Sequence, residues 1–395
     1  MAQSTENIAK DTKHISGANA TSPKHHKKNR RKTRRGATVI ACILITIIVI
    51  LAGLFTYVIL ADNPFQKKEA AGVKTDKLFD TQPLEVPLPE PEISITVSVV
   101  GDCTLGTDEN FNYSRSLNRY YELNGPAYFF KSVKSIFEAD DLTIANLEGT
   151  FTNSTSRVDK TYAFKGPAEF VNILTEGSVE AVTLANNHSR DYGAQSLTDT
   201  RNTLDSAGVI HFGYDETAVV DVKGVKVGLV GIYELIDGVG RSQQVKNNIA
   251  KVKADGADVV IVIFHWGIER DVAPDYNQTT LGRLAIDAGA DLVCGHHPHV
   301  LQGIETYKGK SIVYSLGNFC FGGNSNPSDK DTMIFQQTFT LTKDGLKADH
   351  VTNIIPCSLS SVKTRNDYQP TPATGDEATR ILNKIRERSA LIKTP

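Results

Sequence analysis

The stretch "GADLVCGHHPHVLQG", residues 289–303, places His296, His297 and His299 within four positions directly after an apolar run. The apolar residues, within 290–297, predict a buried strand. In sheets of parallel strands, ligands bind just beyond the carboxyl ends of the strands. Three imidazoles at such an end therefore predict metal or phosphate chemistry at one edge of a sheet.

Apolar, β-branched runs alternate with helical patterns from residue 93 onward. The predicted strands are 93–102, 141–149, 179–188, 225–233, 257–267, 290–297 and 310–319. The predicted helices are 126–139, 166–177, 194–208, 244–256 and 279–289. This alternation predicts one α/β domain with a largely parallel sheet whose faces are covered by helices. After Phe321, two strand-like runs about a "KDG" turn predict an antiparallel hairpin at the edge of the sheet.

Six of the seven predicted strands end in a carboxylate, an imidazole or a carboxamide, the ligand types that Zn, Mn or Fe prefer. Besides the three histidines, these side chains are Asp102, Asn146, Glu148, Asn186, Asn187, His188, His265, Glu269 and Asn318. Taken singly, Asp102 also fits a helix cap, Asn187 a turn and His265 a core histidine. Their recurrence at matching strand ends favours a single shared site.

His297 and His299 are two residues apart. If the chain leaves the strand still extended, their side chains project to the same side and that of His296 to the other. The pair would then hold one or two metals, whereas a structural hydrogen bond is favoured for His296.

Cys103 and Cys294 lie beside these candidates. Either could be a soft ligand or a nucleophile, but their place within or next to apolar strands favours small buried hydrophobes. Four cysteines lie after the N-terminal apolar segment, and one disulfide among them stays possible without a preferred pair: Cys103, Cys294, Cys320 and Cys357. The sequence has no G-x-S-x-G elbow and no H-E-x-x-H motif, so serine nucleophile chemistry lacks support.

The N-terminal region has the features of a membrane anchor. Residues 1–36 form a basic tail with ten Lys and Arg against two acidic residues. Residues 37–61 are uncharged and long enough, at about 1.5 Å per residue, to cross a hydrocarbon core of about 30 Å. The basic tail then predicts a cytoplasmic N-terminus and an extracytoplasmic remainder. The proline-rich segment 62–92 predicts an extended stalk.

Two other interpretations of the N-terminal region are less favoured. A cleavable signal peptide would have a shorter apolar region with a cleavage site close behind it. The basic run could bind nucleic acid, but its place beside a membrane span favours a role in topology, so we expect no nucleic-acid partner. The cell membrane is the expected location, with a single pass.

Seven motifs occur in order between residues 93 and 355: "VVGDCTLG", "NLEGTFT", "FKGP", "LANNHSRDYG", "FHWGIE", "GADLVCGHHPHVLQGIE" and "VYSLGNF". Together they resemble the bacterial capsule synthesis family of CapA type, a branch of the calcineurin-like metallophosphoesterase superfamily. The resemblance implies a four-layer α/β/β/α sandwich over 93–362 with its site at the strand ends. The remaining segment, 363–395, is expected to be a polar tail whose helix, 376–392, either packs on the domain or trails free.

Position by position, the resemblance implies these metal ligands: Asp102, Glu148, Asn187, His265, His297 and His299. It gives His188 contact with the scissile group, so that His188 and Asp102 are the candidate catalytic residues. Four further residues are expected around the ligands: Asn146, Glu269, His296 and Asn318. Two departures matter, because Thr104 stands where the superfamily has a histidine and Glu148 where it has an aspartate. We therefore expect one or two divalent ions, Mn, Zn or Fe.

The expected function is that of a membrane-anchored, extracytoplasmic metallohydrolase in the metabolism of capsule poly-γ-glutamate or another envelope polymer. The bond cleaved would be a phosphoester or a γ-glutamyl amide, with the anionic polymer and membrane synthase subunits as partners. The alternative is a non-catalytic accessory subunit of a synthesis and export complex. A surface adhesin is a third option, but the net charge of −10 after residue 36 argues against binding an anionic polymer by bulk charge.

Overall fold

A computed structural model describes residues 92–349 and 351–393 of the chain. The predicted basic tail, transmembrane segment and nearly all of the stalk lie outside these residues. Among the residues that are described, no helix is long and apolar enough to cross a membrane.

Strand β1 (Ile93–Thr104) is the centre of the first sheet, whose order is β17-β16-β14-β1-β2-β5-β6. On one side it pairs in parallel with β2 (Leu142–Leu147), followed by β5 (Ala181–Thr183) and β6 (Ile210–Phe212). The other side is antiparallel: β14 (Asp331–Thr342), β16 (Val351–Ser358) and β17 (Thr371–Pro372). Two short strands complete it: β13 (Asn318–Phe321) beside β1 and β15 (Gly345–Leu346) beside β14.

The second sheet has the order β11-β12-β10-β9-β8-β7. Its four inner strands are parallel: β8 (Val225–Tyr233), β9 (Val259–His265), β10 (Leu292–His296) and β12 (Lys310–Val313). Its antiparallel edges are β7 (Ala218–Val222) and β11 (Ile304–Tyr307). Two short strands, β3 (Thr150–Phe151) and β4 (Lys165–Gly166), pair apart from both sheets.

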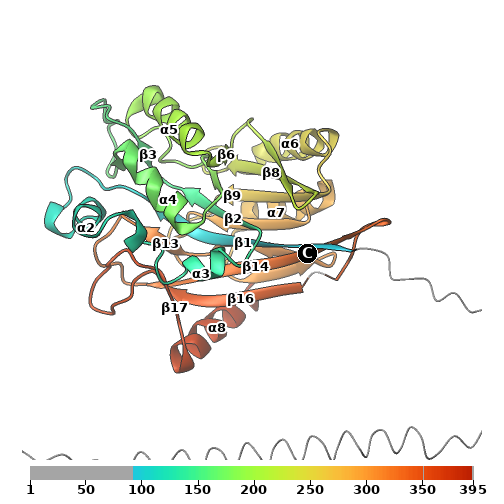
Figure 1. Ribbon diagram of the computed structural model, residues 1–395. Helices are drawn as coiled ribbons and strands as arrows, with labels where there is room; N and C mark the ends of the chain where they lie inside the picture. Colours follow the sequence, from blue (N-terminus) through green and yellow to red (C-terminus); the bar gives the residue numbers. More distant parts are fainter. Residues whose placement is uncertain (1–91, 350, 394–395) are drawn as a thin grey trace, which may run out of the picture. The chain divides into compact units, whose positions relative to one another are not determined.

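Helices cover the outer faces of the two sheets (Figure 1). The helices packed on the first sheet are α3 (Lys134–Phe137), α4 (Val171–Gly177) and α5 (Gly193–Ala207). Those packed on the second are α6 (Ser242–Ala254) and α7 (Tyr276–Ala288). Near the first sheet lie α2 (Leu117–Asn124) and three 3-10 turns, η1 (Tyr113–Arg115), η2 (Pro126–Tyr128) and η3 (Ala168–Phe170); η4 (Gly238–Arg241) precedes α6.

Three hydrophobic cores separate the resulting layers. Because neighbouring side chains of a strand point to opposite faces, Ile144 of β2 faces the core between the sheets and Ala145 faces the helices. In β9, Ile263 and Phe264 alternate in the same way. Both faces of these strands are buried, which explains why their sequences are continuous apolar runs and not alternating ones.

The prediction of an α/β fold is confirmed, and the two large sheets agree with the sandwich that the resemblance implies. The largely parallel sheet expected from the alternation of strands and helices describes the inner strands of the second sheet, whereas the first sheet is mixed. The run 310–319 divides between β12 of the second sheet and β13 of the first. Gly317, with a φ of 72°, lies at this crossing, and its carbonyl accepts a hydrogen bond of 2.9 Å from the backbone N–H of Asp102. Periodicity cannot detect such a crossing, because both halves are equally apolar.

Three further expectations differ from the structure. The hairpin after Phe321 does not lie at an edge, because β14 pairs with the central strand β1 from Ile93 to Val100. The predicted helix 126–139 is divided into η2 and α3. The predicted strand 179–188 is regular only in β5, so the residues that follow Thr183 lie in a loop.

The C-terminal helix α8 (Gly375–Ser389) packs on the domain beside β16 and β11 (Figure 1), which decides between the two alternatives that the sequence leaves open. Its Ile381 and Ile385 enter the core between the sheets. Arg380 donates two hydrogen bonds of 2.6 Å to the buried carboxylate of Asp331 in β14. The helix therefore closes one side of the sandwich.

We expect Ile381→Ala to lower the free energy of unfolding by about 2–5 kcal/mol, because it leaves a cavity in the core. Chemical denaturation of the full chain, followed by circular dichroism, measures this change. Glu387→Ala, on the exposed face of the same helix, is the control and should change stability by less than about 0.5 kcal/mol. Equal, small effects of both substitutions would mean that the helix is not docked.

Candidate metal centre

The carboxyl ends of strands from both sheets meet at one place. In the first sheet, Asp102 of β1 lies opposite Asn146 of β2, and Glu148 follows β2 directly. In the second, His265 ends β9 and lies opposite His296, the last residue of β10. The parallel register therefore brings side chains that are far apart in the sequence to one edge of the sandwich.

Three overlapping groups of side chains offer ligand atoms that lie within 4.8 Å of one another. One consists of Glu148, His265 and His297, and another of Asp102, Glu148 and His299. Glu148 belongs to both, so a single carboxylate faces two adjacent positions. The third group contains His297, His299 and Glu269, which we had expected only near the ligands. Five of the six ligands that the resemblance implies thus belong to at least one of these groups, and Asn187 is the sixth.

The sixth implied ligand, Asn187, lies at the edge of the same cluster. Its Oδ1 is 2.7 Å from Nε2 of His265, which in turn is 3.7 Å from Oε1 of Glu148. A carboxamide oxygen is an ordinary ligand for hard divalent ions, so this atom extends the donor set.

Asp102 and Glu148 have no exposed surface, and their ion-pair partners within the described parts of the chain are histidines. Nδ1 of His299 is 3.3 Å from Oδ2 of Asp102, and Nε2 of the same ring is 3.8 Å from Oε1 of Glu148. Buried carboxylates are costly without cationic partners. The two carboxylates therefore create a strong local preference for positive charge.

The pKa shifts show the same electrostatic imbalance. Burial raises the pKa of Glu148 to about 8, against the lowering effect of His299. Burial also acts to raise the pKa of Asp102, but a hydrogen bond with His299 and the neighbouring imidazoles hold it well below its usual range. Burial acts to lower the pKa of His299, whereas Glu148 and Asp102 raise it to about 10. Burial lowers the pKa of His297 to about 3, which favours its neutral, metal-binding form.

Two buried atoms of the cluster lack a hydrogen-bond partner among the described residues: Oε1 of Glu148 and Nδ1 of His297. Buried polar atoms normally have partners, and for an orphan within a cluster of ligand types a bound ion would supply the partner. Carboxylate, imidazole and carboxamide donors together suit a borderline or hard divalent cation. The residues present therefore fit one or two such ions.

Asparagines hold the ligands in place. Asn146 donates to Oδ1 of Asp102 over 2.8 Å, and its Nδ2 is 3.2 Å from Nδ1 of His265. Asn186 donates to Oδ1 of Asn146 over 2.9 Å. Oδ1 of Asn318 lies 2.8 Å from Nδ1 of His299. Such outer contacts fix the orientation of imidazole and carboxylate ligands.

The segment 296–299, the histidine turn, is not extended, contrary to the geometry assumed from the sequence for His297 and His299. His297 and His299 have φ values of 93° and 57°, in the left-handed region that non-glycine residues seldom adopt. Their rings still face the cluster, because the ring centroid of His297 is 4.8 Å from that of His265 and 5.6 Å from that of His299. His296 instead lies 2.9 Å, through Nε2, from the carbonyl of Val100, which is the structural role that the sequence favours.

Thr104, which replaces the histidine expected from the resemblance, donates a hydrogen bond of 3.2 Å to Oε2 of Glu148. A hydroxyl in this position orients the carboxylate. The ligand set is thus smaller on the side of Asp102 than the superfamily pattern implies.

His188 belongs to a network that sequence reasoning missed in part. Its Nδ1 is 2.7 Å from Oδ2 of the buried Asp191, whose Oδ1 accepts a bond of 2.8 Å from Lys160. Burial lowers the pKa of His188, although Asp191 opposes this effect. The spacing "HSRD" was a signal for Asp191, since a turn brings residues three apart together. Lys160 comes from an irregular loop, and no sequence pattern pointed to it.

The four cysteines of the described region are free and buried. Burial raises the pKa of Cys103 to about 12 and raises that of Cys294 well above its usual value. Neither is therefore suited to be a thiolate nucleophile or ligand, as the buried-hydrophobe alternative predicts.

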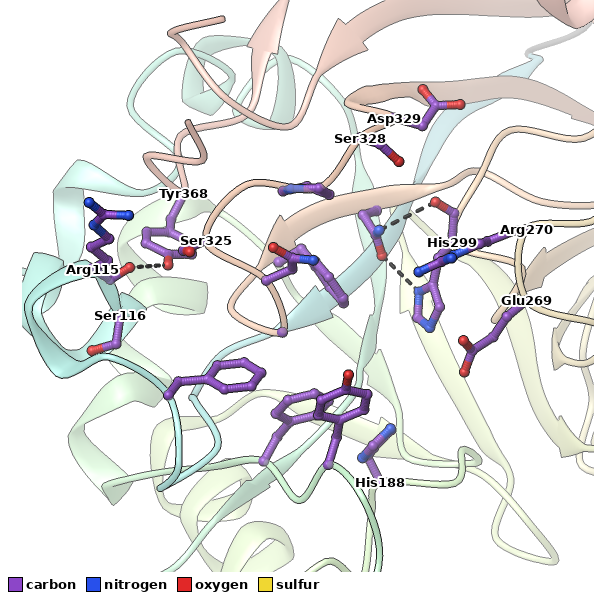
Figure 2. A pocket seen from close by; sticks show the side chains of 18 of the residues that line it. Arg115, Ser116, His188, Glu269, Arg270, His299, Ser325, Ser328, Asp329 and Tyr368 are labelled. Atoms are coloured by element: carbon purple, nitrogen blue, oxygen red, sulfur yellow. Dashed lines mark hydrogen bonds between the residues drawn. The ribbon is translucent and has the colours of Figure 1, made fainter. Parts of the chain in front are cut away.

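A pocket of about 440 Å³ opens beside the cluster. Figure 2 shows His188, Glu269 and His299 among its lining residues, and Asn318 also lines it. Of the six candidate ligands, His299 lines this pocket, so one edge of the cluster and the side chain of His188 border a space that a substrate can enter.

Comparisons with known proteins agree with this site. Residues 96–323 match the family described as bacterial capsule synthesis protein PGA_cap. The PGA biosynthesis protein CapA of Bacillus subtilis (strain 168) is 32% identical over 283 residues, 66% of this chain and 71% of that protein. The capsule biosynthesis protein CapA of Bacillus anthracis is 30% identical over 276 residues, 63% of this chain and 62% of that protein.

Among solved structures, the 5'-nucleotidase of Candida albicans SC5314 resembles this chain at a TM-score of 0.40 and 10% identity, covering 76% of this chain and 59% of that one. This likeness is too distant to carry an argument. The family match covers more than half of the chain, including every candidate ligand. The chain belongs to the bacterial capsule synthesis protein family.

Proposed function

We propose that this protein is a membrane-anchored, extracytoplasmic, metal-dependent hydrolase that acts on polyglutamate in capsule synthesis. The observation that carries the proposal is the pair of buried carboxylates, Asp102 and Glu148, surrounded by imidazoles beside an open pocket. The role in capsule synthesis is supported by family membership and by the names of the two CapA relatives.

Six residues would hold one or two divalent ions, Mn, Zn or Fe: Asp102, Glu148, Asn187, His265, His297 and His299. Bound ions of this kind supply a polarised scissile bond and a water molecule of lowered pKa. Asp102 is fixed by Asn146, and the histidine turn receives a backbone restraint because the N–H of His297 donates to Oδ2 of Asp102 over 3.3 Å. The ligands are thus positioned by the protein itself.

His188 would act as the general acid or base that transfers a proton during hydrolysis. Its Nδ1–H donates to Asp191, which leaves Nε2 as the free ring nitrogen of a side chain that lines the pocket. Asp191 is itself held by Lys160 and by the backbone N–H of Phe164, at 2.8 and 2.6 Å. This arrangement fixes both the tautomer and the direction of the imidazole, which general acid–base catalysis requires.

The second candidate is a non-catalytic accessory subunit that keeps the metal fold. Thr104 stands where the resemblance implies a histidine, so one of the two implied metal positions has one ligand fewer. This departure favours the accessory role. In either case we propose synthase subunits in the membrane as partners.

Glu148→Gln is expected to separate metal binding from folding. The substitution removes a buried ionisable group whose ion-pair partners among the described residues are histidines, so the metal-free protein should be as stable as the wild type or more stable. The increase in melting temperature on adding Mn²⁺ or Zn²⁺ should be lost, because ligand binding stabilises only the folded state.

Elemental analysis of the full chain is the second readout, and it should find one or two ions in the wild type. His211→Ala is the control, since His211 of β6 pairs with the exposed Asp205 away from the cluster. Equal metal content in Glu148→Gln, His211→Ala and the wild type would contradict the proposed centre.

Hydrolysis decides between the two candidate functions. The full chain loaded with each metal is offered poly-γ-glutamate and a phosphomonoester side by side, and product formation is followed by chromatography. His188→Asn should lower kcat about 10²–10⁴-fold with unchanged metal content, because it removes the proton-transfer group. Asp191→Asn should lower kcat with little effect on KM. No cleavage of any substrate by the wild type would favour the accessory role.

The proposed membrane topology has its own test. Protease added to intact cells without a wall is expected to degrade the domain that follows residue 92. The basic tail, 1–36, should become accessible only after the membrane is broken. Protection of the domain until lysis would overturn the proposed extracytoplasmic location.

A further inference from the structure

Two guanidinium groups in the pocket beside the candidate metal centre have no partner among the residues that the structure describes. Arg115 and Arg270 both line it, and within residues 92–349 and 351–393 neither side chain makes an ion pair or a hydrogen bond. Figure 2 shows Arg115 on one side of the pocket with Ser116 and Tyr368, and Arg270 on the other with Glu269 and His299. The two charges therefore mark two separate places on the pocket wall.

The carboxylates that line the pocket do not neutralise these arginines. Asp329 is bound by Lys384, whose Nζ lies 3.2 Å from both carboxylate oxygens. Glu269 faces His297 and His299, with ligand atoms within 4.8 Å of theirs. The pocket thus has unpaired positive charge at both ends, which is the complement of an anionic ligand with at least two charged groups.

Both arginines come from backbone that is fixed in place. Arg270 has a φ of 68°, and its backbone N–H donates to the carbonyl of Pro298 over 2.8 Å, which ties it to the histidine turn. Arg115 ends η1, where its carbonyl accepts a hydrogen bond from the hydroxyl of the buried Tyr368. The separation between the two places is therefore a property of the fold.

Aromatic rings make up part of the same pocket. The rings of Phe111 and Tyr162 meet edge to face at 5.9 Å, and those of Tyr162 and Phe164 are parallel at 6.4 Å. Phe164 also lies against the imidazole of His188, with 4.5 Å between ring centroids. An apolar wall next to two cationic groups suits a ligand whose charges are joined by methylene or amide segments.

We propose that this pocket is a two-point binding site for a linear polycarboxylate, in which Arg270 holds a carboxylate beside the metal ligands and Arg115 holds another at the far end. The inference rests on the proposed function and extends it from the reacting bond to the neighbouring units of the chain. An oligo-γ-glutamate fits this chemistry, because each unit carries one carboxylate and successive units are joined by methylenes and an amide.

A small phosphomonoester fits the pocket less well. Its single anionic group would lie at the metal centre, and an attached base could stack on the aromatic rings. Arg115 would then stay unpaired at the far side of the pocket. The structure therefore favours a ligand that reaches from one arginine to the other.

Binding as a function of ligand length tests this proposal. The full chain, loaded with Mn²⁺ and carrying His188→Asn so that ligands are not consumed, is titrated calorimetrically with γ-glutamate oligomers of about two and about eight units and with AMP. The long oligomer should bind at least about tenfold more tightly than the short one, because only it gains the charge-assisted contact with Arg115.

Arg115→Gln should abolish this gain and leave the affinity for the short oligomer unchanged, whereas Arg270→Gln should weaken the binding of both. Arg115→Lys should keep part of the gain, because it keeps the charge. Arg386→Gln is the matched control on the exposed face of α8, outside the pocket, and should behave as the parent. Circular dichroism checks that each variant is folded.

The proposal is overturned if the length gain survives in Arg115→Gln, or if this variant weakens both oligomers equally. AMP binding as tight as that of the long oligomer and independent of Arg115 would overturn it as well. Hydrolysis by the chain without substitutions is measured separately. A chain that cleaves nothing but keeps the Arg115-dependent gain would refute the hydrolase and leave the binding site standing.

Discussion

Two carboxylates without solvent contact, Asp102 and Glu148, impose the main physical constraint on this protein. Asp102 lies near the end of β1 and Glu148 directly after β2, and packing on both faces of these strands excludes water from the two carboxylates. The surrounding imidazoles and asparagine amides offset part of the free-energy cost of burying these carboxylates. The site is thus a consequence of where the two sheets join, and a divalent cation is the partner that its donor atoms suit.

The same junction explains the strained backbone nearby. Strand β10 ends at His296, whose ring lies against the carbonyl of Val100 in the other sheet. The chain must then turn sharply to bring His297 and His299 back towards Glu148, and both residues adopt positive φ values. Strain of this kind persists only where surrounding contacts hold it, and here it presents two imidazoles to one carboxylate.

Recognition outside the metal centre depends on segments with little regular structure. The loop that carries Lys160 fixes Asp191 and through it His188, and the same loop supplies Tyr162 and Phe164 to the pocket. A C-terminal residue, Tyr368, fixes the turn that carries Arg115. Loops held by a rigid scaffold commonly carry binding residues, and here loops line the pocket while the strand ends supply candidate ligands.

The sequence by itself determined the elements with a strong periodic or apolar signal. It predicted 225–233 as a strand with the bounds that β8 has, and it predicted α5, α6 and α7 within three residues at each end. It also identified the strand ends that carry Asp102, Glu148, His265 and the histidine turn. Local patterns suffice here, because a strand buried on both faces needs a continuous apolar sequence. Polar side chains at the end of such a strand stand out, since they need polar partners or a ligand.

Only the tertiary structure decided how these pieces combine. The division of 310–319 between two sheets, the central place of β14 and the docking of α8 depend on contacts between distant segments. The partners Asp191 and Lys160 and the opposed arginines 115 and 270 were likewise invisible in the sequence, since their meaning lies in what they face across the pocket. Sequence spacing reports which side of an element a residue occupies, whereas charge complementarity across space is set by packing.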